Sequence, residues 1–366
     1  MILTRQNVLP YLVQAGLLGL DRIVGGPLKV VPHQCRNRTF RVIDGRGPGL
    51  FVKQSRPEEG DWHVGSTLET EAQCYALAAG SSRLEAVLAP FRAFDRQHQI
   101  LVLGLIEPAE SLAEHHHRTG EFSVPAAVAA GQALATCHIE LGKALRFGEA
   151  SIDLPSQVPW ILRPDRLDPH ASAAQSAAQA RVVAIVQRHP EIDERLKALA
   201  AGWRVNGIIH GDMKWANCLL DPIGPGDAAP AVRIVDWEMA GTGNVAWDAA
   251  GILQSYLASW IRAAQLRKGD QPAELATTAA PLAPMQHAVQ AFWRAYIDRL
   301  DVGGKAAAGL FGLTVQYAAA RLVQTAFEAM DGDARISGHM VLALQLASNM
   351  LTAPETAAAT LLGVSP

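Results

Sequence analysis

Short apolar runs and turn-forming residues alternate over the first hundred positions. Apolar runs of strand length occupy 28–31, 39–42, 50–52, 87–94 and 99–106. Proline, glycine and aspartate residues separate several of these runs, which is typical of short strands joined by hairpins. A longer stretch at 66–79 has the pattern of a helix. One helix among antiparallel strands predicts a small α+β unit.

Beyond Pro108 the chain becomes alanine-rich, and its apolar residues recur at the three- to four-residue spacing of helices. This spacing predicts helices within 125–141 and 171–201. Helices resume at about 245 and continue to the end, broken by an expected loop at 268–284. The second half of the chain is therefore expected to be mostly helical.

A strand-rich island interrupts these helices, with short apolar runs at 207–209, 218–220 and 232–235. The overall change of pattern predicts an α+β fold of two lobes. The first is a small antiparallel-sheet N-lobe over 1–104, and the second is a larger, mostly helical C-lobe over 105–366.

Composition narrows the class of protein. Apolar residues make up 49% of the 366 positions and charged residues 18%, which is ample material for a large core. The net charge of −3 does not indicate a nucleic-acid partner. The apolar runs of the chain are too short to predict a membrane span. The four cysteines are far apart in the sequence, so we expect reduced thiols in a cytoplasmic protein.

Two short clusters carry the strongest chemical signal, His210–Asn217 and Ile234–Glu238. Phosphoryl transfer needs a carboxylate to orient the acceptor hydroxyl, and oxygen ligands to hold magnesium against the phosphates. Asp212 fits the role of base, while Asn217 and Asp236 fit those of metal ligands.

Two further residues lie within these clusters. Lys214 is placed to contact the transferred phosphate or the base. If Asp236 and Glu238 share a strand, their side chains point to one face, and Glu238 becomes a second acidic metal ligand. Each short motif occurs by chance elsewhere, but their combination with flanking strands is much less common.

The two clusters resemble those of the aminoglycoside phosphotransferase and choline kinase family, which is similar in fold to the protein kinases. The resemblance implies a bilobal protein-kinase-like fold that uses ATP and Mg²⁺. It implies Asp212 as catalytic base and Asn217 and Asp236 as magnesium ligands. His210 is then expected to shape the loop, and Asp248 to brace the loop through its backbone.

The same resemblance extends to the N-lobe. Lys53 resembles the strand lysine that grips the nucleotide phosphates, and Glu71 resembles the helix glutamate that pairs with it. Glu69 competes for this role, because the sequence does not define the phase of the helix. Leu103 and Leu105 lie in a segment that resembles the hinge strand, whose backbone holds adenine.

The loop expected to cover the phosphates has no glycine and instead contains Asn37 between two arginines. Some family members have an Asn-containing hairpin here, and Asn tolerates positive φ better than most residues. The alternative is an ordinary hairpin turn with solvated arginines.

Three functions are compatible with these features. The first is a kinase for a small hydroxylated acceptor such as an amino sugar, amino alcohol or sugar. The second is a kinase for Ser or Thr of a ribosomally made precursor peptide, working with a separate lyase. The third is a pseudokinase scaffold that binds nucleotide or only a partner. The sequence does not identify the acceptor, because acceptor pockets in this fold are built from variable helices and loops.

Overall fold

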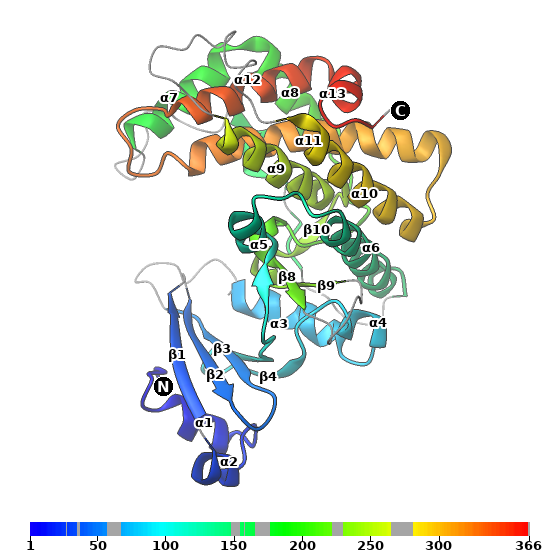
Figure 1. Ribbon diagram of the computed structural model, residues 1–366. Helices are drawn as coiled ribbons and strands as arrows, with labels where there is room; N and C mark the ends of the chain where they lie inside the picture. The colour runs from blue at the N-terminus through cyan, green and yellow to red at the C-terminus, as the bar shows by residue number, and fades with distance from the viewer. Residues whose placement is uncertain are drawn as a thin grey trace.

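The computed structural model describes residues 1–26, 28–34, 37–56, 67–147, 154–156, 158–164, 176–221, 230–264 and 281–364. In these ranges the chain forms a five-stranded antiparallel sheet followed by a larger helical part (Figure 1). Two small sheets lie between the large sheet and the distal helices. This arrangement confirms the predicted α+β class.

The large sheet contains the five strands predicted in the first hundred residues. In spatial order they are β1 (Leu28–Gln34), β2 (Arg38–Asp44), β3 (Leu50–Gln54), β5 (Ile100–Gly104) and β4 (Phe91–Asp95). Every neighbouring pair is antiparallel. The β1–β2 hairpin therefore stands at one edge, and β5 lies inside the sheet beside β3.

The two faces of this sheet bury different cores. Along β5, Ile100 and Val102 pack in a cluster with α1 (Val8–Gln14), whereas Leu101 and Leu103 belong to the main core. Successive strand residues point to opposite faces, so one apolar run serves both cores. This explains why β5 is apolar throughout instead of alternating with polar residues.

The helices around the sheet are α2 (Leu20–Gly25), α3 (Thr67–Ala78) and α4 (Ser82–Glu85). The sequence pattern predicted α3, but it did not predict α4, which is a single turn. Ser81 caps α4 by accepting a hydrogen bond from the Leu84 amide. A cap of this kind allows a helix too short to show apolar periodicity.

The helical part begins with α5 (Leu112–Thr119) and α6 (Val124–Phe147). It continues with α7 (Ala177–Arg188), α8 (Pro190–Ala201), α9 (Ala246–Ala263), α10 (Leu282–Leu300), α11 (Gly304–Glu328), α12 (Gly338–Thr352) and α13 (Pro354–Thr360). Cys74, Cys137 and Cys218 are buried free thiols in the main core, while Cys35 is outside the described residues.

The structure adds detail to two of the helical predictions. The segment expected to be helical over 171–201 contains two helices, because His189 is extended and Pro190 starts the second one. Proline favours the first turn of a new helix and disfavours the α conformation in the residue before it. The loop expected at 268–284 overlaps the start of α10 at Leu282, and its residues 268–280 lie outside the described ranges.

Helix α11 is long and apolar enough, by length and composition, to cross a membrane. However, 61% of its most apolar window is buried inside the protein. It packs against α9 and α12 and contributes to the main core. Burial of this extent is typical of a core helix, which passes the same test of length and hydropathy as a membrane span.

The three predicted runs of the strand-rich island form β7 (Gly207–Ile209), β8 (Cys218–Asp221) and β9 (Ala231–Ile234), which share two small sheets with two short strands that were not predicted, β6 (Glu110–Ser111) and β10 (Gly241–Gly243). One small sheet pairs β7 with β10, and the other contains β6, β8 and β9. The loop between β7 and β8 carries the first chemical cluster, and the segment after β9 carries the second. In the β8–β9 register Cys218 pairs with Ile234, so the two clusters are adjacent.

Asp236 and Glu238 do not share a strand, so the condition under which their side chains would point to one face is not met. Strand β9 ends at Ile234, and Asp236 has a left-handed backbone with φ 71° and ψ 55°. A 3₁₀ turn over Trp237–Met239 follows directly. The alternation of a strand therefore does not apply to the two carboxylates.

Candidate active site

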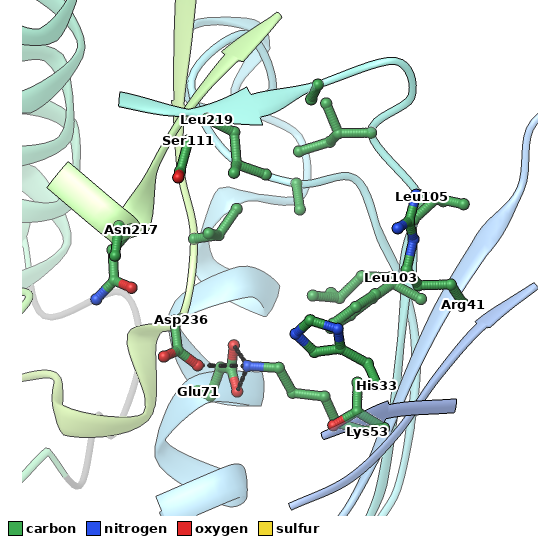
Figure 2. Close-up of a pocket in the computed structure, with 18 of the residues that line it drawn as sticks. His33, Arg41, Lys53, Glu71, Leu103, Leu105, Ser111, Asn217, Leu219 and Asp236 are labelled. Carbon is green, nitrogen blue, oxygen red and sulfur yellow. Dashed lines mark hydrogen bonds and ion pairs between the residues drawn. The ribbon is translucent and has the colours of Figure 1, made fainter. Parts of the chain in front are cut away.

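A cleft of about 680 Å³ lies between the large sheet and the small sheets (Figure 2). All of the residues predicted to bind nucleotide or metal line it, namely Asn37, Lys53, Glu71, Leu103, Leu105, Asn217, Asp236 and Glu238. They come from β3, β5, α3, the hairpin and the segments flanking β8 and β9. Residues far apart in the sequence thus meet in one cavity.

Lys53 is the centre of the charged contacts in this cleft. Its ammonium is 2.8 Å and 2.9 Å from the two carboxylate oxygens of Glu71, and 2.6 Å from Oδ1 of Asp236. Figure 2 shows the ammonium between the two carboxylates. Glu69, the competing partner, instead forms an ion pair with Arg96 at 2.5 Å. Helix α3 therefore directs Glu71, and not Glu69, toward Lys53.

Burial and charge act in opposite directions on this group. Burial raises the pKa of Glu71 to about 7, although the nearby Lys53 ammonium favours its ionised form. Burial alone would lower the pKa of Lys53, but the carboxylates of Glu71 and Asp236 outweigh it and raise that pKa. Burial likewise opposes the charge on Asp236, yet Lys53 holds the pKa of Asp236 below its usual value. Lys53 therefore stays protonated.

Asn37 connects the β1–β2 hairpin to the segment after β9. Its side chain is buried, and Nδ2 donates to Oε2 of Glu238 at 3.0 Å. This contact uses the Asn37 amide, and the expected tolerance of positive φ at this position stays a prediction. Its role in the structure is a side-chain contact across the cleft. Arg36 is outside the described residues, and Arg38 begins β2.

The segment that resembles a hinge lies along one wall of the cleft. Leu103 belongs to β5, and Leu105 follows directly after the strand. The Leu105 amide donates to the Gly49 carbonyl at 2.9 Å, so this N–H is already used within the protein. Leu105 can thus offer a nucleotide base its side chain and carbonyl, but not its amide.

Asp248, in the first turn of α9, holds the backbone of the loop His210–Asn217. Oδ2 of Asp248 accepts from the His210 amide at 2.6 Å, and Oδ1 accepts from the Gly211 amide at 3.0 Å. His138 on α6 also contacts Oδ2, at 3.1 Å. These contacts fit the expectation that Asp248 braces the loop through its backbone.

His210 links this loop to the segment after β9. Its Nε2 lies 2.9 Å from the Val235 carbonyl, and its Nδ1 accepts from the Asp212 amide at 3.3 Å. A carbonyl can only accept, so the proton is on Nε2. Farther along the loop, Nδ2 of Asn217 donates to the Asp212 carbonyl at 2.9 Å. The amide oxygen of Asn217 therefore remains available to the cleft.

Asp212 and Lys214 line a second, smaller cavity of about 260 Å³ between α9 and α11. Nζ of Lys214 is 2.5 Å from Oδ2 of Asp212. Ala113 and Ala216 line both cavities, so the two spaces are neighbours. The predicted base therefore lines a space directly beside the one lined by the predicted nucleotide and metal residues.

Sequence reasoning missed Arg321, a buried residue of α11 that reaches the same loop. Its guanidinium donates to the carbonyls of Gly211 and Met213. The only signal in the sequence is a single arginine within an apolar stretch of a helix. Charged side chains are almost never fully buried without partners, so a charge at such a position indicates a polar contact inside the core.

The donor set fits a hard divalent cation. Asn217 and Asp236 present oxygen atoms to the same cleft, and Glu238 lines it as well. Among the described residues, no group of three or more His, Cys, Asp or Glu side chains could hold a metal by itself. Magnesium commonly takes only one or two protein carboxylates and completes its shell with phosphate oxygens and water. The residues therefore suit a metal that is bound together with a phosphate ligand.

Comparison with known proteins identifies the class. The phosphotransferase enzyme family, abbreviated APH, matches residues 27–285, a span that includes both chemical clusters. The chain therefore belongs to this family and is a phosphotransferase of the kinase class. A search of the curated proteins gives no match.

Solved structures show the same fold. A choline kinase from Cryptosporidium parvum Iowa II is 10% identical with a TM-score of 0.57, and the match covers 94% of this chain and 95% of that one. The GDP complex of aminoglycoside 2'-phosphotransferase-IIIa is 12% identical with a TM-score of 0.50, covering 95% and 100%. These likenesses confirm the predicted protein-kinase-like fold.

Proposed function

We propose that this phosphotransferase transfers the γ-phosphate of ATP, with Mg²⁺, to a hydroxyl group of a small molecule. The observation that carries the proposal is the arrangement of the two adjacent cavities. One holds the Lys53–Glu71 pair together with Asn217 and Asp236, and the other holds Asp212. Such a pair of spaces suits a nucleotide and an acceptor that meet where the two spaces adjoin.

The nucleotide would occupy the larger cleft. In this proposal Lys53 contacts the α- and β-phosphates, and Glu71 holds the lysine in place. Leu103 and Leu105 line the wall against which adenine would lie, and Asn37 closes the cleft over the phosphates. The boundary between an N-lobe over 1–104 and a C-lobe over 105–366 would then pass through the nucleotide site.

Asn217 and Asp236 would hold magnesium, with Glu238 as a further acidic ligand. Bound there, the ion would neutralise charge on the phosphates. Asp212 would accept the hydrogen bond of the acceptor hydroxyl and take its proton, and Lys214 would steady the transferred phosphate. Asn217 and Asp236 line the larger cleft, whereas Asp212 and Lys214 line the smaller cavity. This distribution supports separate roles in metal binding and in proton transfer.

The acceptor would enter the smaller cavity. Polar side chains of α9 and α11 line it, including Gln254, Ser259 and Gln324. A volume of about 260 Å³ is below the usual range for drug-sized ligands, so we infer an acceptor of the size of an amino alcohol or a monosaccharide. We also propose that the enzyme acts in the cytoplasm, without nucleic-acid or membrane partners.

The test is magnesium-dependent ATP turnover with a panel of amino sugars, amino alcohols and sugars, together with candidate Ser- and Thr-containing peptides. Phosphorylation is read as ADP release and as the added mass of a phosphate on the acceptor. We expect Asp212→Ala to slow turnover with the best acceptor by about 10²–10⁴-fold.

Asp193→Ala is the matched control, since Asp193 pairs with Lys197 on the surface of α8, and it should keep normal turnover. Absence of ATP binding at millimolar concentration would contradict the proposal. Phosphate transfer to peptides alone would replace the small-molecule acceptor by the peptide alternative.

A further inference from the structure

Arg321 lies deep in the helical part, on the side of α11 that faces the loop His210–Asn217. Its side chain is 5% exposed. Nη1 donates to the Gly211 carbonyl at 3.3 Å, and Nη2 donates to the Met213 carbonyl at 2.9 Å. These two residues are the immediate neighbours of Asp212. One guanidinium therefore holds the backbone on both sides of the proposed base.

The same guanidinium also faces the Asp212 side chain. Nη2 lies 3.7 Å from Oδ1 of Asp212, while Nζ of Lys214 contacts Oδ2 at 2.5 Å. The carboxylate therefore lies between two cations, each on a different oxygen. Arg321 acts from the buried side, and Lys214 acts from the side that is open to solvent. This arrangement defines the orientation of the carboxylate as well as the position of its backbone.

Burying an arginine carries a desolvation cost that its contacts must offset, so its burial is weak evidence for a role in stability. Burial lowers the pKa of Arg321, and its Nε has no hydrogen-bond partner among the described residues. The guanidinium also lies over the ring of Trp247, with Cζ 5.0 Å from its centroid. A well-packed apolar side chain would fill the same space without this cost.

The neighbouring helix makes room for this contact. A Cβ atom at Gly251 of α9 would lie 2.0 Å from the Met213 carbonyl oxygen and 3.2 Å from Cζ of Arg321. Only a residue without a side chain lets α9 approach the loop while Arg321 occupies the other side. Gly251 and Arg321 together thus define the place of the Met213 carbonyl.

We propose that Arg321 is a positioning residue of the phosphotransferase, which acts on the reaction through Asp212. It holds the Gly211 and Met213 carbonyls so that the Asp212 carboxylate faces the cavity between α9 and α11. This inference rests on the proposed role of Asp212. It assigns a function to a residue outside both chemical clusters, more than 100 positions beyond the loop in the sequence.

The test compares Arg321→Met, Arg321→Lys and the control Lys305→Met in the full-length protein. Lys305 is an exposed cation at the start of α11, far along the helix from the site. Because misplacing a catalytic group by about 1 Å costs about 100-fold in rate, we expect Arg321→Met to lower kcat by about that factor. The KM and Kd for ATP should stay within about twofold, because the nucleotide cleft is untouched.

Arg321→Lys keeps the charge but cannot hold two carbonyls in the same fork, so its kcat should lie between those of Arg321→Met and the unaltered enzyme. If Arg321→Met does not fold, Arg321→Lys alone decides, by a lowered kcat at unchanged Kd for ATP. Added guanidinium ion should restore part of the rate of an Arg321→Ala variant, whose short side chain leaves room for it, at concentrations that leave the control unaffected.

An unchanged kcat in a folded Arg321→Met or Arg321→Lys protein would overturn the inference while Asp212→Ala remains inactive. Equal losses of kcat and of ATP affinity would also overturn it, because they indicate a general loosening of the structure. Full activity of Asp212→Ala would instead remove the proposed function on which the inference rests.

Discussion

The loop that carries Asp212 and the residues of the larger cleft are held in different ways. The loop is anchored from within the helical part by Asp248 and Arg321, both buried and both bonded to its backbone. The cleft residues are instead held by side-chain contacts that cross from the large sheet to the segment after β9. These contacts are Lys53 with Asp236, and Asn37 with Glu238.

This difference indicates which geometry exists before a ligand arrives. Backbone anchors do not compete with substrates, so the loop can keep its shape with and without nucleotide. The cross-cleft contacts use the very side chains that we propose for phosphates and metal, and a ligand would have to replace them in part. Substitutions in the two regions should therefore affect different quantities.

Asp248→Asn should have the largest effect, and it tests the backbone anchor of the loop. This change removes a charge that two amides and His138 contact inside the core, so we expect a loss of about 3 kcal/mol in unfolding free energy and a loss of activity. Burial opposes the charge on Asp248, but the contacts with His138 and His210 hold its pKa below the ordinary 3.8. Urea unfolding at several pH values measures the effect.

The sign of the pH dependence follows from this lowered pKa. The stabilising contribution is present above the unfolded-state pKa of about 3.8 and is lost as the pH falls through the lower folded-state pKa. The gap between the unaltered protein and Asp248→Asn should thus be full at pH 7 and shrink below pH 4. Asp298→Asn, an exposed change on α10, is the control. A difference in unfolding free energy that stays constant below pH 4 would contradict the role of the Asp248 carboxylate as the anchor of the loop.

Glu71→Gln tests the cross-cleft region and should have a smaller effect. The substitution keeps the shape of the side chain but leaves Lys53 with Asp236 as its carboxylate partner. We expect the KM for ATP to rise about tenfold, which corresponds to the loss of one charge-assisted hydrogen bond. Glu69→Gln on the same helix is the matched control, and steady-state kinetics gives the KM for ATP of both variants. Equal increases in KM would show that the contact of Glu71 with Lys53 does not contribute to ATP binding.

Asn37→Ala should have the smallest effect. It removes one neutral-to-charged hydrogen bond near the edge of the cleft, so the KM for ATP should rise by about fivefold or less at unchanged kcat. Asn37→Asp should be worse than Asn37→Ala, because it sets a second carboxylate against Glu238. Isothermal titration with an ATP analogue gives both affinities. The reverse order would rule out a direct contact with Glu238.

Local sequence patterns were enough for the five strands of the large sheet, for the longer helices and for the two chemical clusters, but not for the short elements β6, β10, α2, α4 and α5. The apolar run of β5 and the spacing in α3 follow from periodicity, and the His210–Asn217 cluster has a distinctive composition. The break at Pro190 was missed because alanine-rich periodicity continues across it. Local patterns therefore predict elements well, but not all of their boundaries.

The missing parts of the site depend on tertiary structure. Glu69 and Glu71 differ by 200° around a helix, so only the packing of α3 decides which one meets Lys53. The left-handed backbone at Asp236 ends a strand that the apolar run suggested would continue. Arg321 contacts the loop across more than 100 residues, and no local pattern encodes such a contact.

Two alanines, Ala113 from α5 and Ala216 from the loop, line both cavities. A methyl group is the shortest side chain, so these positions add little bulk between the proposed donor and acceptor sites. Under the proposed function, a longer residue at either place would stand between the donor and the acceptor. The enzyme could then still load its donor and its acceptor, yet fail to bring them within reach of each other.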